Sequence, residues 1–158
     1  GDIVLDVGCA PGGWLQVASK AVGEEGFVLG IDLKDAEPPA KNVATCKSDI
    51  CAPQTLKTIL NILPRRCNVV LSDLSPKVSG VWELDHRKQI YMTRCVINIL
   101  PDVLSKGGSA VLKMFEGEML LPLVKELEGV FRSVRRVKPE ASRRASSEVY
   151  IVCLSYLS

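Results

Sequence analysis

Lys113 is the residue of this chain whose position is hardest to explain without chemistry. It interrupts the apolar segment 109–115, where a buried charge is costly unless it is paired or functional. Asp73 and Glu148 stand at the end and at the start of two other strand-like segments, and they could hold the Lys113 amine by hydrogen bonds. Lys113 could then act as a base or as an orienting cation. A strand-end lysine paired with a nearby carboxylate is the structural alternative.

A glycine-rich turn near the start of the chain has the composition of a nucleotide site. The apolar segment 3–7 leads into a turn that contains Gly8 and Gly12, and a helical pattern begins near Trp14. Small residues let the backbone approach a ligand closely, and strand, glycine turn and helix in this order form a nucleotide-shaped site. Ala10 replaces a glycine of the dinucleotide fingerprint, and the absence of Gly-Lys-Ser/Thr excludes a P-loop. An ordinary tight turn without a ligand is the alternative.

Two further carboxylates end the next two strand-like segments. Asp32 follows Gly8 at roughly the interval where an acidic residue meets ribose hydroxyls in nucleotide-binding folds. Asp49 could accept a hydrogen bond from the exocyclic amine of an adenine. Aspartate also favours helix N-caps and turns, so a structural role is the alternative for both residues.

Strand-like and helix-like segments alternate along the chain and would gather these residues at one edge. Strands are expected at 2–7, 26–31, 42–47, 67–72, 108–114, 130–137 and 147–155, and helices at 11–22, 36–41, 53–62, 84–104 and 118–128. This order predicts an α/β fold in one domain, with a mostly parallel seven-stranded sheet and helices on both faces. The last two strands should pair as an antiparallel hairpin at one end, which puts Glu148 at the ligand-binding edge.

The charge of the chain is unevenly distributed. Residues 1–64 carry a net negative charge and residues 65–158 a net positive one. The basic cluster within 132–144 is typical of a phosphate-contacting patch or of a solvated strand face. No apolar run approaches the roughly 18 residues that a membrane span needs, so no membrane partner is expected.

The six cysteines and one histidine show no metal-ligand spacing, so the sequence predicts no metal site. Most of the cysteines lie in apolar segments, where free cysteine behaves as a small hydrophobic residue. We therefore expect a reducing, intracellular (cytoplasmic) setting. His86 begins the long helical segment, where we expect a surface or capping residue rather than a catalyst.

Four segments of the chain carry a resemblance to a known family. Residues 6–14, 72–80, 111–117 and 138–150 together resemble the FtsJ/RrmJ group of RNA ribose 2′-O-methyltransferases, and the match spans essentially the whole chain in the right order. The resemblance implies a Rossmann-like methyltransferase fold that uses S-adenosyl-L-methionine. The residues that it places around this cofactor are Gly8, Gly12, Trp14, Asp32, Asp49 and Asp73.

The resemblance also implies catalytic roles. The family uses a Lys-Asp-Lys-Glu tetrad, and Asp73, Lys113 and Glu148 fall on its last three positions. Lys113 corresponds to the residue assigned as the proton acceptor from the ribose 2′-hydroxyl. The first lysine of the tetrad lies on a helix before the first strand. We expect that helix to lie upstream of residues 1–158, and a piece without it to be incompletely active.

The substrate that the resemblance implies is RNA. Arg143 and Arg144 are expected to hold RNA phosphates, and Lys77 lies in a loop expected to cover the acceptor. Members of the group methylate large-subunit (23S-type) ribosomal RNA, usually at a uridine, and relatives act on transfer RNA anticodon loops. Both RNAs therefore remain alternative substrates, and a catalytically silent RNA-binding module remains an alternative function. Segment 72–76 lacks the second proline and the aromatic residue of adenine-methylating enzymes, and a small-molecule O-methyltransferase would not need the basic cluster. The sequence predicts no particular protein partner.

Overall fold

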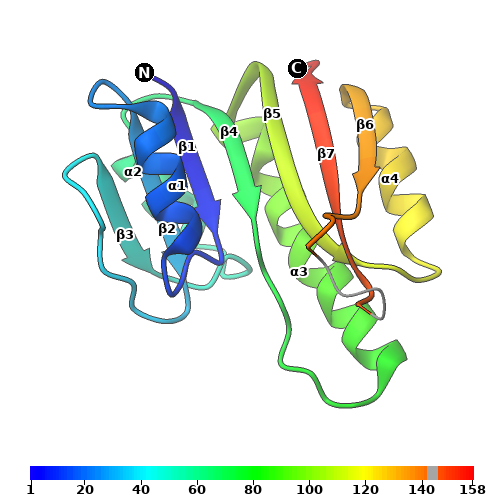
Figure 1. The fold of residues 1–158 in the computed structure, drawn as a ribbon. Coiled ribbons are helices and arrows are strands. Elements are labelled where there is room, and N and C mark those ends of the chain that lie inside the picture. The colour runs from blue at the N-terminus through cyan, green and yellow to red at the C-terminus, as the bar shows by residue number, and fades with distance from the viewer. Residues whose placement is uncertain (142–145) are drawn as a thin grey trace.

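The computed structural model describes residues 1–141 and 146–158, which contain one seven-stranded sheet (Figure 1). Its strands are β1 (Ile3–Val7), β2 (Phe27–Asp32), β3 (Val43–Lys47), β4 (Cys67–Ser72), β5 (Leu104–Phe115), β6 (Phe131–Val137) and β7 (Glu148–Tyr156). The helices are α1 (Gly13–Val22), α2 (Thr55–Ile62), α3 (Trp82–Val103) and α4 (Leu120–Glu128). Among the described residues, no helix is both long and apolar enough to cross a membrane.

The sheet has the strand order β3-β2-β1-β4-β5-β7-β6. Strands β1 to β5 pair in parallel, whereas β7 runs antiparallel to both of its neighbours, β5 and β6. The expected sheet, mostly parallel with an antiparallel hairpin at one end, is therefore confirmed. In this hairpin the second strand, β7, lies next to β5, so the first strand, β6, forms the edge of the sheet.

Apolar side chains on the two faces of the sheet pack against different helices. On one face, Val4 of β1 forms a cluster with Leu15 of α1. On the other face, Leu5 and Leu112 pack with side chains of α2, α3 and α4 (Figure 1). Because side chains alternate along a strand, a buried Leu112 leaves Lys113 on the face that α1 covers. Figure 1 shows α1 over β1 and β2, with no helix of the described residues over β5 and β7 on this face.

The short helix expected at 36–41 is absent, and this prediction was wrong. Pro38 and Pro39 explain the outcome, because proline lacks the N–H that a helix bonds and disfavours helical geometry in the residue before it. The chain crosses here without regular structure, and Thr45 Oγ1 fastens it by donating to the Ala36 carbonyl at 2.7 Å.

Strand β5 begins at Leu104, earlier than expected, and directly after the end of α3. Leu104 lies opposite Cys67 of β4, and the register then shifts before Ser109 lies opposite Val69. Gly107 within this irregular stretch has φ 79°, which is the left-handed conformation that glycine adopts without strain. The glycines therefore form a bulge inside the strand and do not precede it.

Cys51 and Cys95 form a disulfide, whereas the sequence predicts free cysteines. Their Cα atoms lie 5.2 Å apart although 44 residues separate them along the chain. The bond ties the segment after β3 to α3. No spacing rule could pair these two residues, because they meet only once α3 has packed beneath the sheet.

Candidate active site

A cavity of about 820 Å³ opens at the carboxyl ends of β1, β2, β3 and β4. Its lining includes most of the residues assigned to binding from the sequence: Gly8, Asp32, Asp49, Asp73 and Lys77. Lys88, Tyr91 and Met92 of α3 close the opposite wall. Open α/β sheets bind ligands at this edge. Gly12 and Trp14, which were also assigned to the cofactor, do not line the cavity.

The turn after β1 is shaped by glycines with positive φ. Gly8 has φ 80° and Gly12 has φ 127°. The Gly8 N–H donates to the Ile31 carbonyl at 2.8 Å, which fastens the turn to β2. A Cβ at Gly8 would lie 3.0 Å from the Leu74 nitrogen and 3.1 Å from the Asp73 carbonyl carbon. The turn therefore packs directly on the backbone that carries Asp73.

Asp32 and Asp49 both bind neighbouring backbone. Asp32 accepts hydrogen bonds from the Ala10 N–H at 2.9 Å and the Lys34 N–H at 2.8 Å. Asp49 accepts one from the Cys51 N–H at 2.9 Å. These contacts fit the structural role that aspartate has in turns. Each carboxylate oxygen can accept more than one hydrogen bond, so both residues can still bind a ligand in the cavity.

Asp6 of β1 is a fully buried carboxyl group that forms no ion pair with any of the described residues. Its exposed fraction is 0%, and neither oxygen has a hydrogen-bond partner within residues 1–141 and 146–158. Burial raises the pKa of Asp6 to about 7, and the nearby carboxylates of Asp73 and Asp32 add to this increase. A cationic ligand would relieve the repulsion among these three groups. Sequence reasoning placed Asp6 at a strand end and gave it no role.

The raised pKa of Asp6 makes stability depend on pH. Because the folded protein holds this proton up to about pH 7 and the unfolded chain releases it near 3.8, stability falls as pH rises between these values. Asp6→Asn stays neutral at every pH and removes this dependence. Between low pH and pH 7, linkage therefore moves the stability difference by up to roughly 4 kcal/mol in favour of the variant. Urea unfolding from pH 4 to pH 7.5 measures it, and parallel curves for the two proteins would contradict the assignment.

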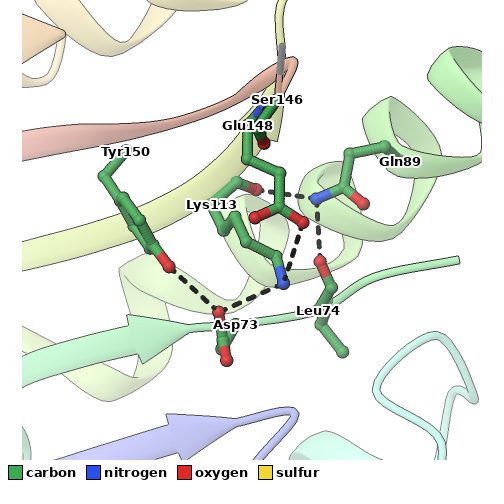
Figure 2. Close-up of polar contacts among 7 residues, drawn as sticks. All are labelled: Asp73, Leu74, Gln89, Lys113, Ser146, Glu148 and Tyr150. Carbon is green, nitrogen blue, oxygen red and sulfur yellow. Dashed lines mark hydrogen bonds and ion pairs between the residues drawn. The ribbon is translucent and has the colours of Figure 1, made fainter. Parts of the chain in front are cut away.

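Lys113 contacts two carboxylates from neighbouring strands (Figure 2). Its Nζ lies 3.2 Å from Asp73 Oδ1 and 4.0 Å from Glu148 Oε1. The Lys113 side chain is 9% exposed, whereas the side chains of Asp73 and Glu148 are 33% and 41% exposed. The structure thus brings together the three residues predicted to be catalytic. A shielded amine between open carboxylates can hold or exchange a proton with a ligand at the cavity edge.

The sheet register explains why these three residues meet. Ser72 lies opposite Leu112, so the next residues of β4 and β5 are Asp73 and Lys113. On the other side of β5, Glu148 lies opposite Phe115. Residues two apart in a strand share a face, so Glu148 points to the same side as Lys113. The expected position of Glu148 at this edge is confirmed.

Tyr150 belongs to this cluster, although sequence reasoning did not single it out. It lies directly opposite Lys113, and its hydroxyl donates to Asp73 Oδ1 at 3.5 Å (Figure 2). Burial raises the pKa of Tyr150, and the carboxylates of Asp73 and Glu148 raise it further, so the phenol stays a hydrogen-bond donor. Its ring centre lies 5.8 Å from that of Trp14, which accounts for the position of that tryptophan. The signal in the sequence was its two-residue spacing from Glu148.

His86 is buried, which corrects the prediction that it is a surface or capping residue. It is 5% exposed, and its Nε2 accepts a hydrogen bond from the Met119 N–H at 3.2 Å. Burial lowers its pKa, which favours the neutral ring that this contact needs. Gly117 packs against it so closely that a Cβ there would lie 2.5 Å from Nε2. His86 therefore holds the segment after β5 against α3.

The residues expected to contact RNA are only partly described. Lys77 is exposed in the segment after β4 and lines the cavity. Arg143 and Arg144 lie outside the described residues, so their predicted contact with RNA remains a prediction. Within the basic cluster on β6, Arg132 and Arg135 are exposed, and Arg136 pairs with Glu116 at 3.5 Å.

Comparison with known proteins identifies the family. The sequence profile of the FtsJ-like methyltransferases matches residues 1–156. The chain belongs to this family. A relative from Methanococcus vannielii, named ribosomal RNA large subunit methyltransferase E, is 42% identical over 156 residues. That alignment covers 98% of this chain and 60% of the relative, so the chain spans about 60% of such a relative's length.

Solved structures show the same fold. A protein of Plasmodium falciparum described as a ribosomal RNA methyltransferase superposes with a TM-score of 0.88 at 26% identity, covering 100% of this chain and 88% of its own. A protein of Streptococcus mutans described as a methyltransferase, solved with SAH, gives a TM-score of 0.66 at 18% identity over 99% of this chain and 89% of its own. The predicted resemblance to the FtsJ group and the predicted methyltransferase fold are both confirmed.

Proposed function

We propose that the protein transfers a methyl group from S-adenosyl-L-methionine to a ribose 2′-hydroxyl of RNA. The observation that carries this proposal is the Lys113 amine between Asp73 and Glu148 at the edge of the cavity. These residues occupy the last three positions of the Lys-Asp-Lys-Glu tetrad that the FtsJ group uses. Membership of that family supports the same assignment.

The residues of the cavity fit S-adenosyl-L-methionine. Asp32 can accept hydrogen bonds from ribose hydroxyls, and Asp49 can accept one from the adenine amine. The Asp73 carboxylate lines the cavity and suits a ligand that carries positive charge, and the buried Asp6 carboxyl behind it interacts electrostatically with Asp73. When bound, this cofactor supplies an electrophilic methyl group on a positively charged sulfur.

The residues around Lys113 prepare the hydroxyl for attack. In-line transfer requires the nucleophilic oxygen about 3 Å from the methyl carbon and aligned with it. Asp73 and Glu148 hold the Lys113 amine from two sides, and the Tyr150 hydroxyl holds Asp73. Lys113 then either accepts the proton of the 2′-hydroxyl or orients that hydroxyl as a cation.

The substrate that we propose is a uridine of large-subunit (23S-type) ribosomal RNA. The name of the 42%-identical relative from Methanococcus vannielii supports this choice. The exposed arginines of β6 and the exposed Lys77 offer positive charge to RNA phosphates on both sides of Lys113.

A methylation assay of the full-length protein with mapping of the modified nucleotide tests this function. Labelled S-adenosyl-L-methionine is supplied with purified ribosomal RNA or transfer RNA. We expect label at the 2′-oxygen of a uridine in the large-subunit RNA, and titration calorimetry should show binding of the cofactor. Label in transfer RNA alone would reassign the substrate to an anticodon loop. Cofactor binding without transfer to either RNA would overturn the proposal and leave a silent RNA-binding module.

A further inference from the structure

Gln89 of α3 contacts the backbone on both sides of the Lys113–Asp73 pair (Figure 2). Its exposed fraction is 0%. Its amide nitrogen donates to the Lys113 carbonyl at 2.7 Å and to the Leu74 carbonyl at 2.9 Å. Leu74 directly follows Asp73. One amide group therefore joins the backbone of the lysine to the backbone next to its carboxylate partner.

The bridge lies where the pairing of β4 with β5 ends. The last residues in register are Ser72 and Leu112, and the Asp73 N–H donates to Val7 of β1 at 3.0 Å. The backbone after Ser72 therefore leaves the β4–β5 ladder at the point where the catalytic side chains begin. The two N–H groups of the Gln89 amide connect the segment after β4 to strand β5 just beyond this point.

The buried polar face of α3 holds the same two segments at further points. Asp85 accepts hydrogen bonds from the Ser79 N–H at 2.9 Å and from its hydroxyl at 2.7 Å. His86 accepts one from the Met119 N–H, as described above. Ser79 lies in the segment after β4, and Met119 lies in the segment after β5. Gln89 is the member of this face that reaches the backbone of Lys113 itself.

We propose that Gln89 is a positioning residue that fixes the separation between the Lys113 amine and the Asp73 carboxylate. The buried Gln89 side-chain oxygen, which lacks a hydrogen-bond partner among the described residues, supports this role over simple packing. An unpaired buried acceptor is costly, so an apolar side chain would serve better if only packing mattered. The effect on catalysis rests on the proposed function, whereas the effect on geometry does not.

Gln89→Met in the full-length protein tests the proposal, because methionine keeps the length and removes both donors. Misplacement of a catalytic group by about 1 Å can cost 10²-fold, so we expect kcat to fall by roughly 10- to 100-fold. The KM for RNA and the Kd for S-adenosyl-L-methionine should change by less than about threefold, since Gln89 touches neither ligand. Thr93→Val is the matched control. Thr93 lies on the same helix with 0% exposure, and its hydroxyl has no partner within the described residues.

Gln89→Glu adds the pH dependence of kcat, which would not change if Gln89 served only in packing. A protonated carboxyl donates one hydrogen bond, whereas an ionised one donates none. The kcat of Gln89→Glu, relative to wild type at the same pH, should therefore rise as the pH falls. Thermal unfolding of each variant confirms that the measured protein is folded. Wild-type kcat in Gln89→Met, or an equal loss in Thr93→Val, would overturn the positioning role.

A measurement independent of activity separates this inference from the proposed function. If the wild-type protein methylates neither RNA, the proposed function fails, and the geometry can still be read from the ¹³C shift of the Lys113 side chain in lysine-labelled protein. Gln89→Met should move this resonance and Thr93→Val should not. An unmoved resonance in folded Gln89→Met would overturn the proposal whatever the assay shows.

Discussion

Replacing Lys113 with methionine is expected to lower the rate of methyl transfer by about 10²- to 10⁴-fold, the range that a positioned acid–base group contributes. Methionine keeps most of the buried stem and removes the amine that lies 3.2 Å from Asp73. The loss should appear in kcat, while calorimetry should give nearly the wild-type Kd for S-adenosyl-L-methionine. Lys125→Met on α4 is the control, because this exposed lysine lies outside the cavity lining. Wild-type kcat in Lys113→Met would remove Lys113 from the mechanism.

Lys113→Arg separates the two roles that Lys113 can have. Arginine stays protonated in proteins, so it can orient a hydroxyl but cannot accept its proton. If Lys113 is the base, the arginine variant should be as inactive as the methionine variant. If Lys113 is an orienting cation, the arginine variant should keep part of the lost rate.

Gly8→Ala is expected to destabilise the turn after β1 through both backbone strain and crowding. An alanine at φ 80° costs about 1–2 kcal/mol in backbone strain. Its Cβ would also lie 3.0 Å from the Leu74 nitrogen, and overpacking of this kind costs roughly 1–3 kcal/mol more. The two nearest atoms, the Leu74 nitrogen and the Asp73 carbonyl carbon, belong to backbone, so a rotamer change of Leu74 does not relieve the contact. Urea unfolding should therefore show a loss of about 2–5 kcal/mol.

Gly13→Ala provides the matched control for Gly8→Ala. Gly13 begins α1, and a Cβ there would meet nothing within 4 Å. Alanine should therefore leave stability unchanged or raise it slightly, because it restricts the unfolded chain. Equal effects of the two substitutions would show that the close approach of Gly8 to Leu74 carries no energetic weight.

The sheet and the meeting of Asp73, Lys113 and Glu148 at one edge could be predicted because both follow from local patterns, whereas the catalytic roles proposed for these residues came from the resemblance to the FtsJ group. Apolar runs located each strand, and the rule that ligands bind at carboxyl ends gathered Asp73 and Lys113. Antiparallel geometry added Glu148 without any knowledge of the register. The failed helix at 36–41 is also a local matter, since its two prolines argue against helix once their backbone effects are weighed.

Contacts that depend on how α3 packs could not be predicted. Gln89 donates to two backbone carbonyls from different segments, and every residue has such a carbonyl, so no residue type marks these contacts in the sequence. The disulfide between Cys51 and Cys95 depends on the same packing. Asp6 was visible as a polar residue at a strand end, but its orphaned oxygens became apparent only in the structure. Polar residues at strand ends thus left patterns in the sequence, whereas the residues of α3 that hold the neighbouring backbone did not.

The position of β7 between β5 and β6 has a consequence for biosynthesis. During translation β6 leaves the ribosome before β7, yet β6 pairs only with β7 in the finished sheet. The nascent chain can therefore assemble the cavity from β1 to β4 while residues 131–137 still wait for a partner strand. Glu148 arrives with that same strand, so the cluster of Asp73, Lys113 and Glu148 and the edge of the sheet are completed together. A chain cut short before Glu148 would lack β7, so β5 and β6 would both lose their partner strand and β5 would present an exposed edge prone to aggregation.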